Sequence, residues 1–392
     1  MSIAAKIQAV LEKASWIRKM FEEGAQLKAT YGADKVFDFS LGNPNLEPPA
    51  RFKEVLIQVA GASGTGHHSY MPNIGYASVR QAVAEFVSTE QGTPVTANEV
   101  IMTCGAAGAL NVMLKAILDP GDEVITPAPY FVEYGFYVDN HSGVLKTVPT
   151  KSDFTLDLGA IEGAITAKTK AVLINSPNNP SGQIYAEESL AQLGALLREE
   201  GHRFKRTIYL ISDEPYRKIA FDGIRVPALF TCYPESMIAT SYSKDLSIPG
   251  ERIGFLAVNP QSTYKEDLLA GMALANRTLG YVNAPALMQR AIESLQGVSV
   301  DIGAYQAKRD LLCDGLSECG YEFIRPKGAF YLFPKSPAPD DVAFVRALQE
   351  ELILTVPGRG FGCPGFFRIA FCVDDDTIKK AMPGFERVLK QF

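Results

Sequence analysis

Short apolar runs alternate with longer helical segments along residues 78–280. Each run is shorter than a helix and ends in turn-forming residues, so each predicts a β-strand. The runs are VIMT (100–103), EVITPAP (123–129), AVLINSP (171–177), TIYLISDEP (207–215), MIATSYS (237–243) and IGFLAV (253–258). Segments between several of them, such as ALNVMLKAILD (109–119), repeat apolar residues at helical spacing. This alternation is typical of an α/β domain whose mostly parallel sheet is flanked by helices.

The two ends of the chain follow other patterns. Residues 1–35 predict an amphipathic helix, because apolar residues recur three and four positions apart. These positions are Ile7, Val10, Leu11, Ala14 and Ile17. The segment DKVFDFSLGNPNLEPP (34–49) predicts a short strand and a loop rich in Gly, Pro and Asn.

A long helical stretch over 288–320 opens the C-terminal part of the chain. Strand candidates follow it at 329–335, 352–358 and 365–373. This order of elements favours a smaller α+β domain. We therefore predict a large domain over 48–286 and a small domain formed by 1–47 together with 287–392.

Composition narrows the class of protein further. The 392 residues are 47% hydrophobic, enough for a sizeable core, and the net charge is only −6 with Lys and Arg scattered. Neither nucleic acid nor a membrane is therefore an expected partner. The N-terminus lacks the apolar core of a secretory signal, and the six cysteines show no metal-binding spacing. We expect a cytoplasmic protein with reduced thiols and no bound metal.

Polar and small residues follow the predicted strands, where ligands bind in parallel α/β sheets. Gly105, Ala106 and Ala107 open a helix after the first strand, and the free N–H groups of a helix start suit a phosphate. A tight turn that binds nothing explains the same residues. Asn179 lies in the turn after AVLINSP, where a turn or helix cap is the alternative.

Two further strand ends carry charged residues. Asp213 closes the run TIYLIS and Tyr216 follows it, so the carboxylate faces a cationic partner or caps a helix. Lys244 follows MIATSYS, and a desolvated lysine is a nucleophile for carbonyl groups, although most loop lysines are merely solvated. Arg252 offers a fork for phosphate, unless it is a surface charge.

As a set, these residues indicate one ligand. Phosphate donors, an acid, an amide, a phenol and a lysine all terminate strands of one predicted sheet. They fit a phosphorylated aldehyde with a ring nitrogen, which describes pyridoxal 5'-phosphate.

The sequence resembles the class I/II aminotransferases among the fold-type-I pyridoxal-phosphate enzymes, because motifs of that family occur in it in the family's order. The resemblance covers nearly the whole chain. Its motifs are LGNP (41–44), Tyr70 with Pro72 and Gly75, TCGAAGAL (103–110), PGDEVITPAPYF (120–131), NSPNNPSG (175–182), SDEPY (212–216), SYSKDLSIPGERIG (241–254), PKGAFY (326–331) and FFRIAF (366–371).

The resemblance implies roles around the cofactor ring. Lys244 would hold pyridoxal phosphate as an aldimine and move the proton between the substrate Cα and the cofactor. Asp213 would keep the ring nitrogen protonated. Asn179 and Tyr216 would hydrogen-bond the phenolic oxygen of the ring, and Phe131 would stack on its face.

It also implies how the phosphate and the substrate are held. The backbone of Gly105, Ala106 and Ala107 would grip the phosphate with Ser241, Ser243 and Arg252. Tyr70 would reach the partner subunit's phosphate, which implies a homodimer. Arg368, with Gly42 and Asn179, would bind the α-carboxylate of the substrate.

The predicted reaction moves an amino group from an L-amino acid to a 2-oxo acid. Aspartate-specific relatives often carry Lys where this chain has Ala107, so small or apolar donors are favoured over aspartate.

Other functions fit parts of the same pattern. A carbon–sulfur β-lyase would share the fold and the lysine, and its release of pyruvate and ammonia without an acceptor distinguishes it. A transcription regulator that contains this domain would need a basic recognition helix, which residues 1–35 do not show. A binding protein without activity would not need every cofactor-contacting position.

Overall fold

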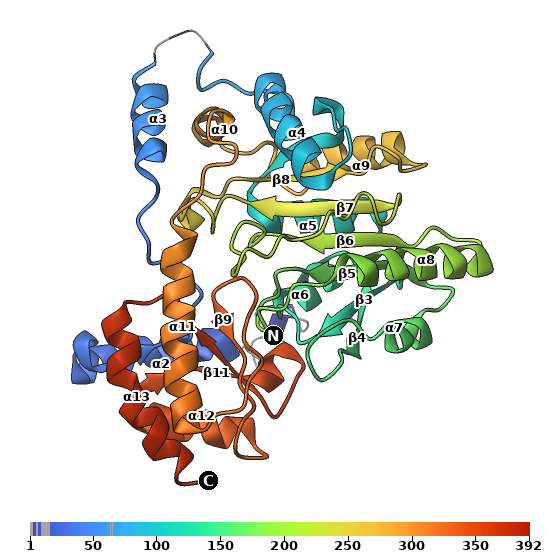
Figure 1. Ribbon diagram of the computed structural model, residues 1–392. Helices are drawn as coiled ribbons and strands as arrows, with labels where there is room; N and C mark the ends of the chain where they lie inside the picture. The colour runs from blue at the N-terminus through green and yellow to red at the C-terminus, as the bar shows by residue number, and fades with distance from the viewer. Residues whose placement is uncertain (1–2, 5–6, 9–15, 63, 65) are drawn as a thin grey trace.

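The computed structural model describes residues 3–4, 7–8, 16–62, 64 and 66–392. Its main feature is a seven-stranded sheet in the order β2-β8-β7-β6-β5-β3-β4 (Figure 1). The strands are β2 (Val100–Thr103), β3 (Glu123–Ala128), β4 (Val144–Pro149), β5 (Thr169–Asn175), β6 (Tyr209–Asp213), β7 (Ser236–Ser241) and β8 (Gly254–Val258). Strand β8 runs antiparallel to both of its neighbours, and the other pairs are parallel.

Helices cover both faces of this sheet (Figure 1). They are α3 (Ala50–Gly61), α4 (Ala77–Gln91), α5 (Gly105–Ile117), α6 (Glu133–Asn140), α7 (Leu158–Ala164), α8 (Glu187–Phe204), α9 (Lys265–Thr278) and α10 (Ala286–Glu293). Successive strand residues point to opposite faces, so Val172 packs with the cluster on α4 and α8 while Leu173 packs with that on α5 and α9. Burial on both faces explains the continuous apolar runs in the sequence.

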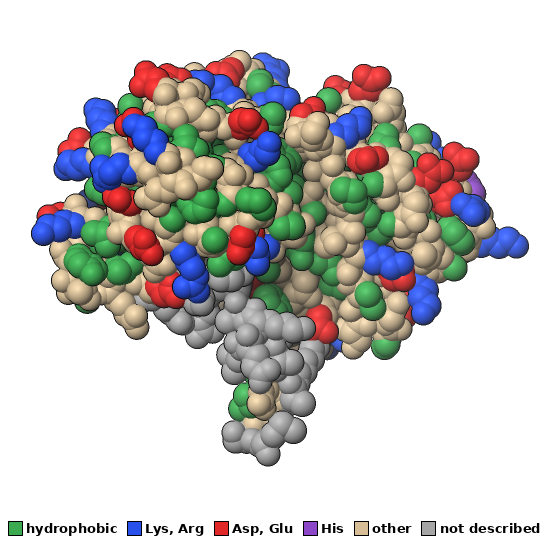
Figure 2. Space-filling view, turned by 90° about the horizontal axis from the view of Figure 1, so that it is seen from below, with side chains coloured by type: hydrophobic (Ala, Val, Ile, Leu, Met, Phe, Trp, Pro, Cys, Tyr) green, Lys and Arg blue, Asp and Glu red, His purple; other side chains and the backbone are tan. Residues whose placement is uncertain are grey.

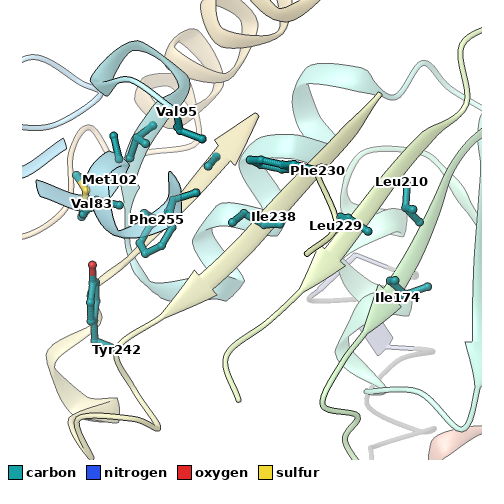
Figure 3. Packing of buried hydrophobic residues seen from close by; sticks show 14 of the residues in the cluster. Val83, Val95, Met102, Ile174, Leu210, Leu229, Phe230, Ile238, Tyr242 and Phe255 are labelled. Carbon is teal, nitrogen blue, oxygen red and sulfur yellow. The ribbon is translucent and has the colours of Figure 1, made fainter. Parts of the chain in front are cut away.

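Figure 3 shows part of the first of these clusters. Val83 of α4, Met102 of β2 and Phe255 of β8 pack together, and each is at most 4% exposed. Ile238 of β7 belongs to the same cluster. This packing fixes β7 and β8. The carboxyl end of β7 and the amino end of β8 lie beside the cavity described below.

A smaller unit combines both ends of the chain (Figure 1). The antiparallel sheet β11-β12-β9 and the parallel pair β1-β10 form its strands. Their bounds are β1 (Phe37–Asp38), β9 (Tyr331–Leu332), β10 (Ile353–Leu354), β11 (Val356–Pro357) and β12 (Phe367–Ala370). The helices are α2 (Trp16–Tyr31), α11 (Ile302–Cys319), α12 (Asp341–Glu350) and α13 (Asp375–Leu389).

The predicted α/β fold, with its mostly parallel sheet and its smaller α+β part, is confirmed. Strand β4 was not predicted, because this edge strand is half-exposed and mixes Lys and Thr with its apolar residues. The helical stretch predicted over 288–320 is two helices, α10 and α11, separated by a turn in which Gly297 has a φ of +80°. The division at 48–286 stays a prediction.

The helix predicted over 1–35 is described only in part. Its apolar positions Val10, Leu11 and Ala14 lie outside the described residues. Within the described part, no helix is long and apolar enough to cross a membrane. On the face shown in Figure 2, positive and negative side chains are interspersed, in keeping with the mild net charge of −6.

Candidate active site

The carboxyl ends of β5, β6 and β7 meet at one cavity. Strand register places Asn175 beside Asp213 and Asp213 beside Ala239, so three strand ends lie next to one another. A cavity of about 350 Å³ lies at this edge of the sheet. Its volume falls within the range of small-molecule sites.

Twelve of the predicted site residues line this cavity. They are Gly42, Ala106, Ala107, Phe131, Asn179, Asp213, Tyr216, Ser241, Ser243, Lys244, Arg252 and Arg368. Gly105 begins α5 against Arg252, since a Cβ placed on it would lie 3.0 Å from Nη2. Tyr70 is not brought to the cavity of its own chain, and its side chain is 90% exposed.

Lys244 lies just beyond β7, with its amine inside the cavity. Burial lowers the pKa of this amine to about 8, and the positive charges of Arg368 and Arg252 act in the same direction. Its Nζ donates a hydrogen bond to the carbonyl oxygen of Gly42, at 2.8 Å. Much of the amine is therefore neutral at mildly alkaline pH, as a nucleophile for an aldehyde needs to be.

Asp213 lines the cavity and carries one oxygen without a hydrogen-bond partner among the described residues. Its Oδ2 accepts a 2.6 Å hydrogen bond from Tyr134, while its buried Oδ1 has no partner among the described residues. Burial raises the pKa of this carboxyl to about 7, and the neighbouring charge of Glu214 raises it further, against the hydrogen bond from Tyr134. A protonated ring nitrogen would satisfy Oδ1 and favour the carboxylate.

Other residues that line the cavity suit a phosphate. The N-cap residue Cys104 makes no side-chain hydrogen bond to α5, so the first N–H groups of this 13-residue helix are uncapped. Arg252 is held there by a 2.8 Å hydrogen bond from its Nη1 to the carbonyl of Pro249. Ser241 and Ser243 line the same cavity and add two hydroxyl groups.

Arg368 is a buried cation without a carboxylate partner in the described structure. Its side chain is 2% exposed, and its Nη1 donates to Asn179 Oδ1 at 3.1 Å. The Nε atom has no hydrogen-bond partner among the described residues. Burying a charge in this way is costly, so Arg368 is poised for an anion that enters the cavity.

Several residues of this site were not predicted from the sequence, among them Tyr134, Asn175 and Tyr331. Tyr134 holds Asp213, and Asn175 anchors the Asp213 carbonyl through a 2.8 Å hydrogen bond. Tyr134 lies three residues after Phe131, a spacing that could have suggested it. Tyr331 ends the motif PKGAFY, and its hydroxyl lies 2.8 Å from that of Tyr216. No pattern in the sequence showed that these two phenols meet.

The residues present thus fit pyridoxal phosphate at both ends of the molecule. The unpaired Asp213 oxygen suits its ring nitrogen, and the uncapped start of α5 suits its phosphate. Among the described residues, no cluster of His, Cys, Asp and Glu could hold a metal ion.

Comparison with known proteins agrees with this geometry. The family model "Aminotransferase class I and II" matches residues 34–384. The chain belongs to the class I and II aminotransferases. This is a family of pyridoxal-phosphate-dependent enzymes, so the protein is a pyridoxal-phosphate-dependent aminotransferase.

Individual relatives of this aminotransferase cover nearly its whole length. The aspartate/prephenate aminotransferase of Thermus thermophilus is 34% identical over 89% of each chain. The aspartate aminotransferase of Geobacillus stearothermophilus is 31% identical over 94% of each chain. An amino transferase of Eubacterium rectale has a crystal structure that superimposes with a TM-score of 0.97, at 41% identity over 100% of this chain and 99% of the other.

The lowered pKa of Lys244 predicts how the aminotransferase takes up its cofactor. Because only the neutral amine attacks an aldehyde, the rate at which cofactor-free protein binds pyridoxal phosphate should rise with pH and level off above about 8. Stopped-flow absorbance measures this rate. Nα-acetyl-lysine, with an ordinary amine pKa near 10.4, is the control for titration of the cofactor itself. A rate that keeps rising beyond pH 9, as the control does, would show that the Lys244 pKa is not lowered.

Proposed function

We propose that this aminotransferase moves the amino group of an L-amino acid to a 2-oxo acid, with Lys244 as the reacting amine. The buried guanidinium of Arg368, which has no carboxylate partner among the described residues, carries this proposal. It shares the cavity with the Lys244 amine, and an α-carboxylate is common to amino acids and 2-oxo acids. Arg368 would therefore bind the amino donor and the 2-oxo acid through the same carboxylate group.

Each residue of the cavity has a chemical task in this proposal. Bound pyridoxal phosphate supplies an aldehyde and a ring that accepts electrons. Lys244 Nζ moves a proton at the substrate Cα, and Asp213 keeps a proton on the ring nitrogen. Asn179 and Tyr216 bind the phenolic oxygen, and Phe131 covers a face of the ring. The start of α5, Ser241, Ser243 and Arg252 hold the phosphate.

A second set of residues binds the substrate in this proposal. Arg368 binds the α-carboxylate, assisted by the Asn179 side chain and the backbone of Gly42. The Gly42 carbonyl already accepts a hydrogen bond from Lys244, so the carboxylate clamp and the reacting amine lie side by side.

The aminotransferase is further proposed to act as a homodimer. Tyr70 is 90% exposed and lies outside its own chain's cavity, as expected of a side chain that reaches the partner's phosphate.

We propose small or apolar amino acids as the preferred donors. Ala107 contributes no charge to the cavity. Among the described residues, the cations that line it are Lys244, Arg252 and Arg368, each of which already has a proposed role. The further acid Glu133 also lines the cavity, where burial raises its pKa. A donor with a second carboxylate would meet Glu133 and no spare cation among the described residues.

The donor preference has a direct kinetic test. At one acceptor concentration, kcat/KM for alanine or methionine should exceed that for aspartate by about tenfold, the factor that one weak charge–charge contact gives. Substituting Ala107→Lys should raise kcat/KM for aspartate relative to that for alanine or methionine. Ala107→Met, whose side chain is of similar length to Lys, is the neutral control. A strong aspartate preference in the unmodified enzyme would overturn the proposal, and would accord with the names of its Thermus and Geobacillus relatives.

A further inference from the structure

Tyr331 connects the two sheets at the active site. It lies on β9 of the small antiparallel sheet and is 2% exposed. Its hydroxyl is 2.8 Å from the hydroxyl of Tyr216, which follows β6 of the large sheet. This hydrogen bond therefore joins the sheet that carries Arg368 to the sheet that carries Asp213.

The ring of Tyr331 supports Arg368 from one side. Strands β9 and β12 pair antiparallel with Tyr331 opposite Ala370, so Arg368, two residues from Ala370, lies diagonally on the same face. The guanidinium carbon lies 4.7 Å from the centroid of the Tyr331 ring and 4.8 Å from that of Phe361. Two aromatic rings hold the cation in a buried position, where this contact is stronger than at an exposed site.

Gly42 makes room for the Tyr331 hydroxyl. A Cβ on Gly42 would lie 1.9 Å from this oxygen, a distance that no side chain allows. The carbonyl of Gly42 accepts the hydrogen bond from Lys244 Nζ at 2.8 Å. One phenol thus meets Tyr216, Arg368 and Gly42, three residues with proposed roles in binding cofactor or substrate.

We propose that Tyr331 is a positioning residue of the transamination site: its hydroxyl fixes Tyr216 against the cofactor, and its ring holds Arg368 for the substrate carboxylate. This inference rests on the proposed function, in which those two residues contact cofactor and substrate. Four titratable or charged groups of the described structure face the phenol. Arg368 lies on β12 and Cys372 in the loop after it, while Tyr216 lies in the loop after β6 and Tyr305 on α11.

The two parts of the side chain have separable effects. Tyr331→Phe removes the hydroxyl and keeps the ring over Arg368. In the holoenzyme it should shift the pH midpoint of the cofactor's absorption band by roughly half to one pH unit, the equivalent of one hydrogen bond. The KM of this variant for the amino donor should stay within about threefold of the KM of the unmodified enzyme. Tyr331→Leu removes the ring as well and should raise this KM by about tenfold or more.

Tyr305→Phe is the matched control. Tyr305 is also a buried tyrosine, but among the described residues its hydroxyl forms no hydrogen bond with Tyr216 or Tyr331. Its substitution should leave both the absorbance midpoint and the KM unchanged. A double-mutant cycle should also show that Tyr216→Phe and Tyr331→Phe shift the midpoint non-additively, because the two residues share one hydrogen bond.

The outcomes separate this inference from the proposed function. A Tyr331→Phe enzyme with the wild-type midpoint, additive shifts in the cycle, or a Tyr305→Phe enzyme with the same shift would each overturn the positioning role. So would an unchanged KM in a folded Tyr331→Leu enzyme. If instead the unmodified holoenzyme showed no change in its absorption band with any amino donor, the proposed function itself would fail.

Discussion

Replacing Lys244 by alanine is expected to reduce kcat for transamination at least about 10³-fold. The substitution would remove both the proposed nucleophile and the group proposed to move the proton, and a positioned acid–base group alone contributes roughly 10² to 10⁴. Because the replaced amine is a buried group held below its ordinary pKa, the folded protein should not lose stability. A coupled assay of 2-oxo acid formation and a thermal melt measure the two effects.

Lys170→Ala is the control for this substitution. Burial also lowers the pKa of the Lys170 amine, but the side chain lines a surface hollow with Lys115 and Tyr264, away from the cavity of Lys244. Its activity should match that of the unmodified enzyme. Wild-type turnover by the Lys244→Ala enzyme would refute the role of Lys244.

Replacing Arg368 by leucine should have the second largest effect. The substrate carboxylate would lose its charged partner, and truncating one side of a buried charge pair costs about 2–5 kcal/mol. We therefore expect kcat/KM to fall by roughly 10²- to 10³-fold, with KM rising for donor and acceptor alike. Thermal stability should hold or increase, since Arg368 is 2% exposed and forms hydrogen bonds but no ion pair among the described residues.

Arg309→Leu should show the opposite pattern. Arg309 is equally buried at 2% exposure, but it forms ion pairs with Asp222 and Asp310. Its loss should lower the melting temperature and leave kcat/KM nearly unchanged. If Arg368→Leu behaved like Arg309→Leu, Arg368 would be structural and the carboxylate clamp would have to lie elsewhere.

The residues that the sequence placed at strand ends do line one cavity, while their roles stay a prediction. Asp213, Ser241 and Lys244 end or follow strands that are buried on both faces, so their runs of apolar residues are unmistakable. Because such strands lie side by side, the sequence also predicted that these residues would meet. The half-exposed edge strand β4 lacks this signal, and it was missed.

Contacts between the two sheets could not be predicted in the same way. The hydroxyls of Tyr216 and Tyr331 are 115 positions apart in the sequence but 2.8 Å apart in the fold. Their meeting depends on how the C-terminal sheet packs against the large one, which no local pattern records. The same holds for Tyr134 and Asp213, whose hydrogen bond depends on where α6 lies on the sheet.

Locating the lysine that holds the cofactor tests the account most directly. Borohydride reduction of the holoenzyme fixes pyridoxal phosphate to the amine that binds it, and mass spectrometry of the peptides then identifies the modified residue. We predict the added mass on the peptide that contains Lys244, and its absence from that peptide when an amino donor is added before reduction. Added mass on any other lysine, or a Lys244 peptide that stays unmodified without donor, would contradict the account.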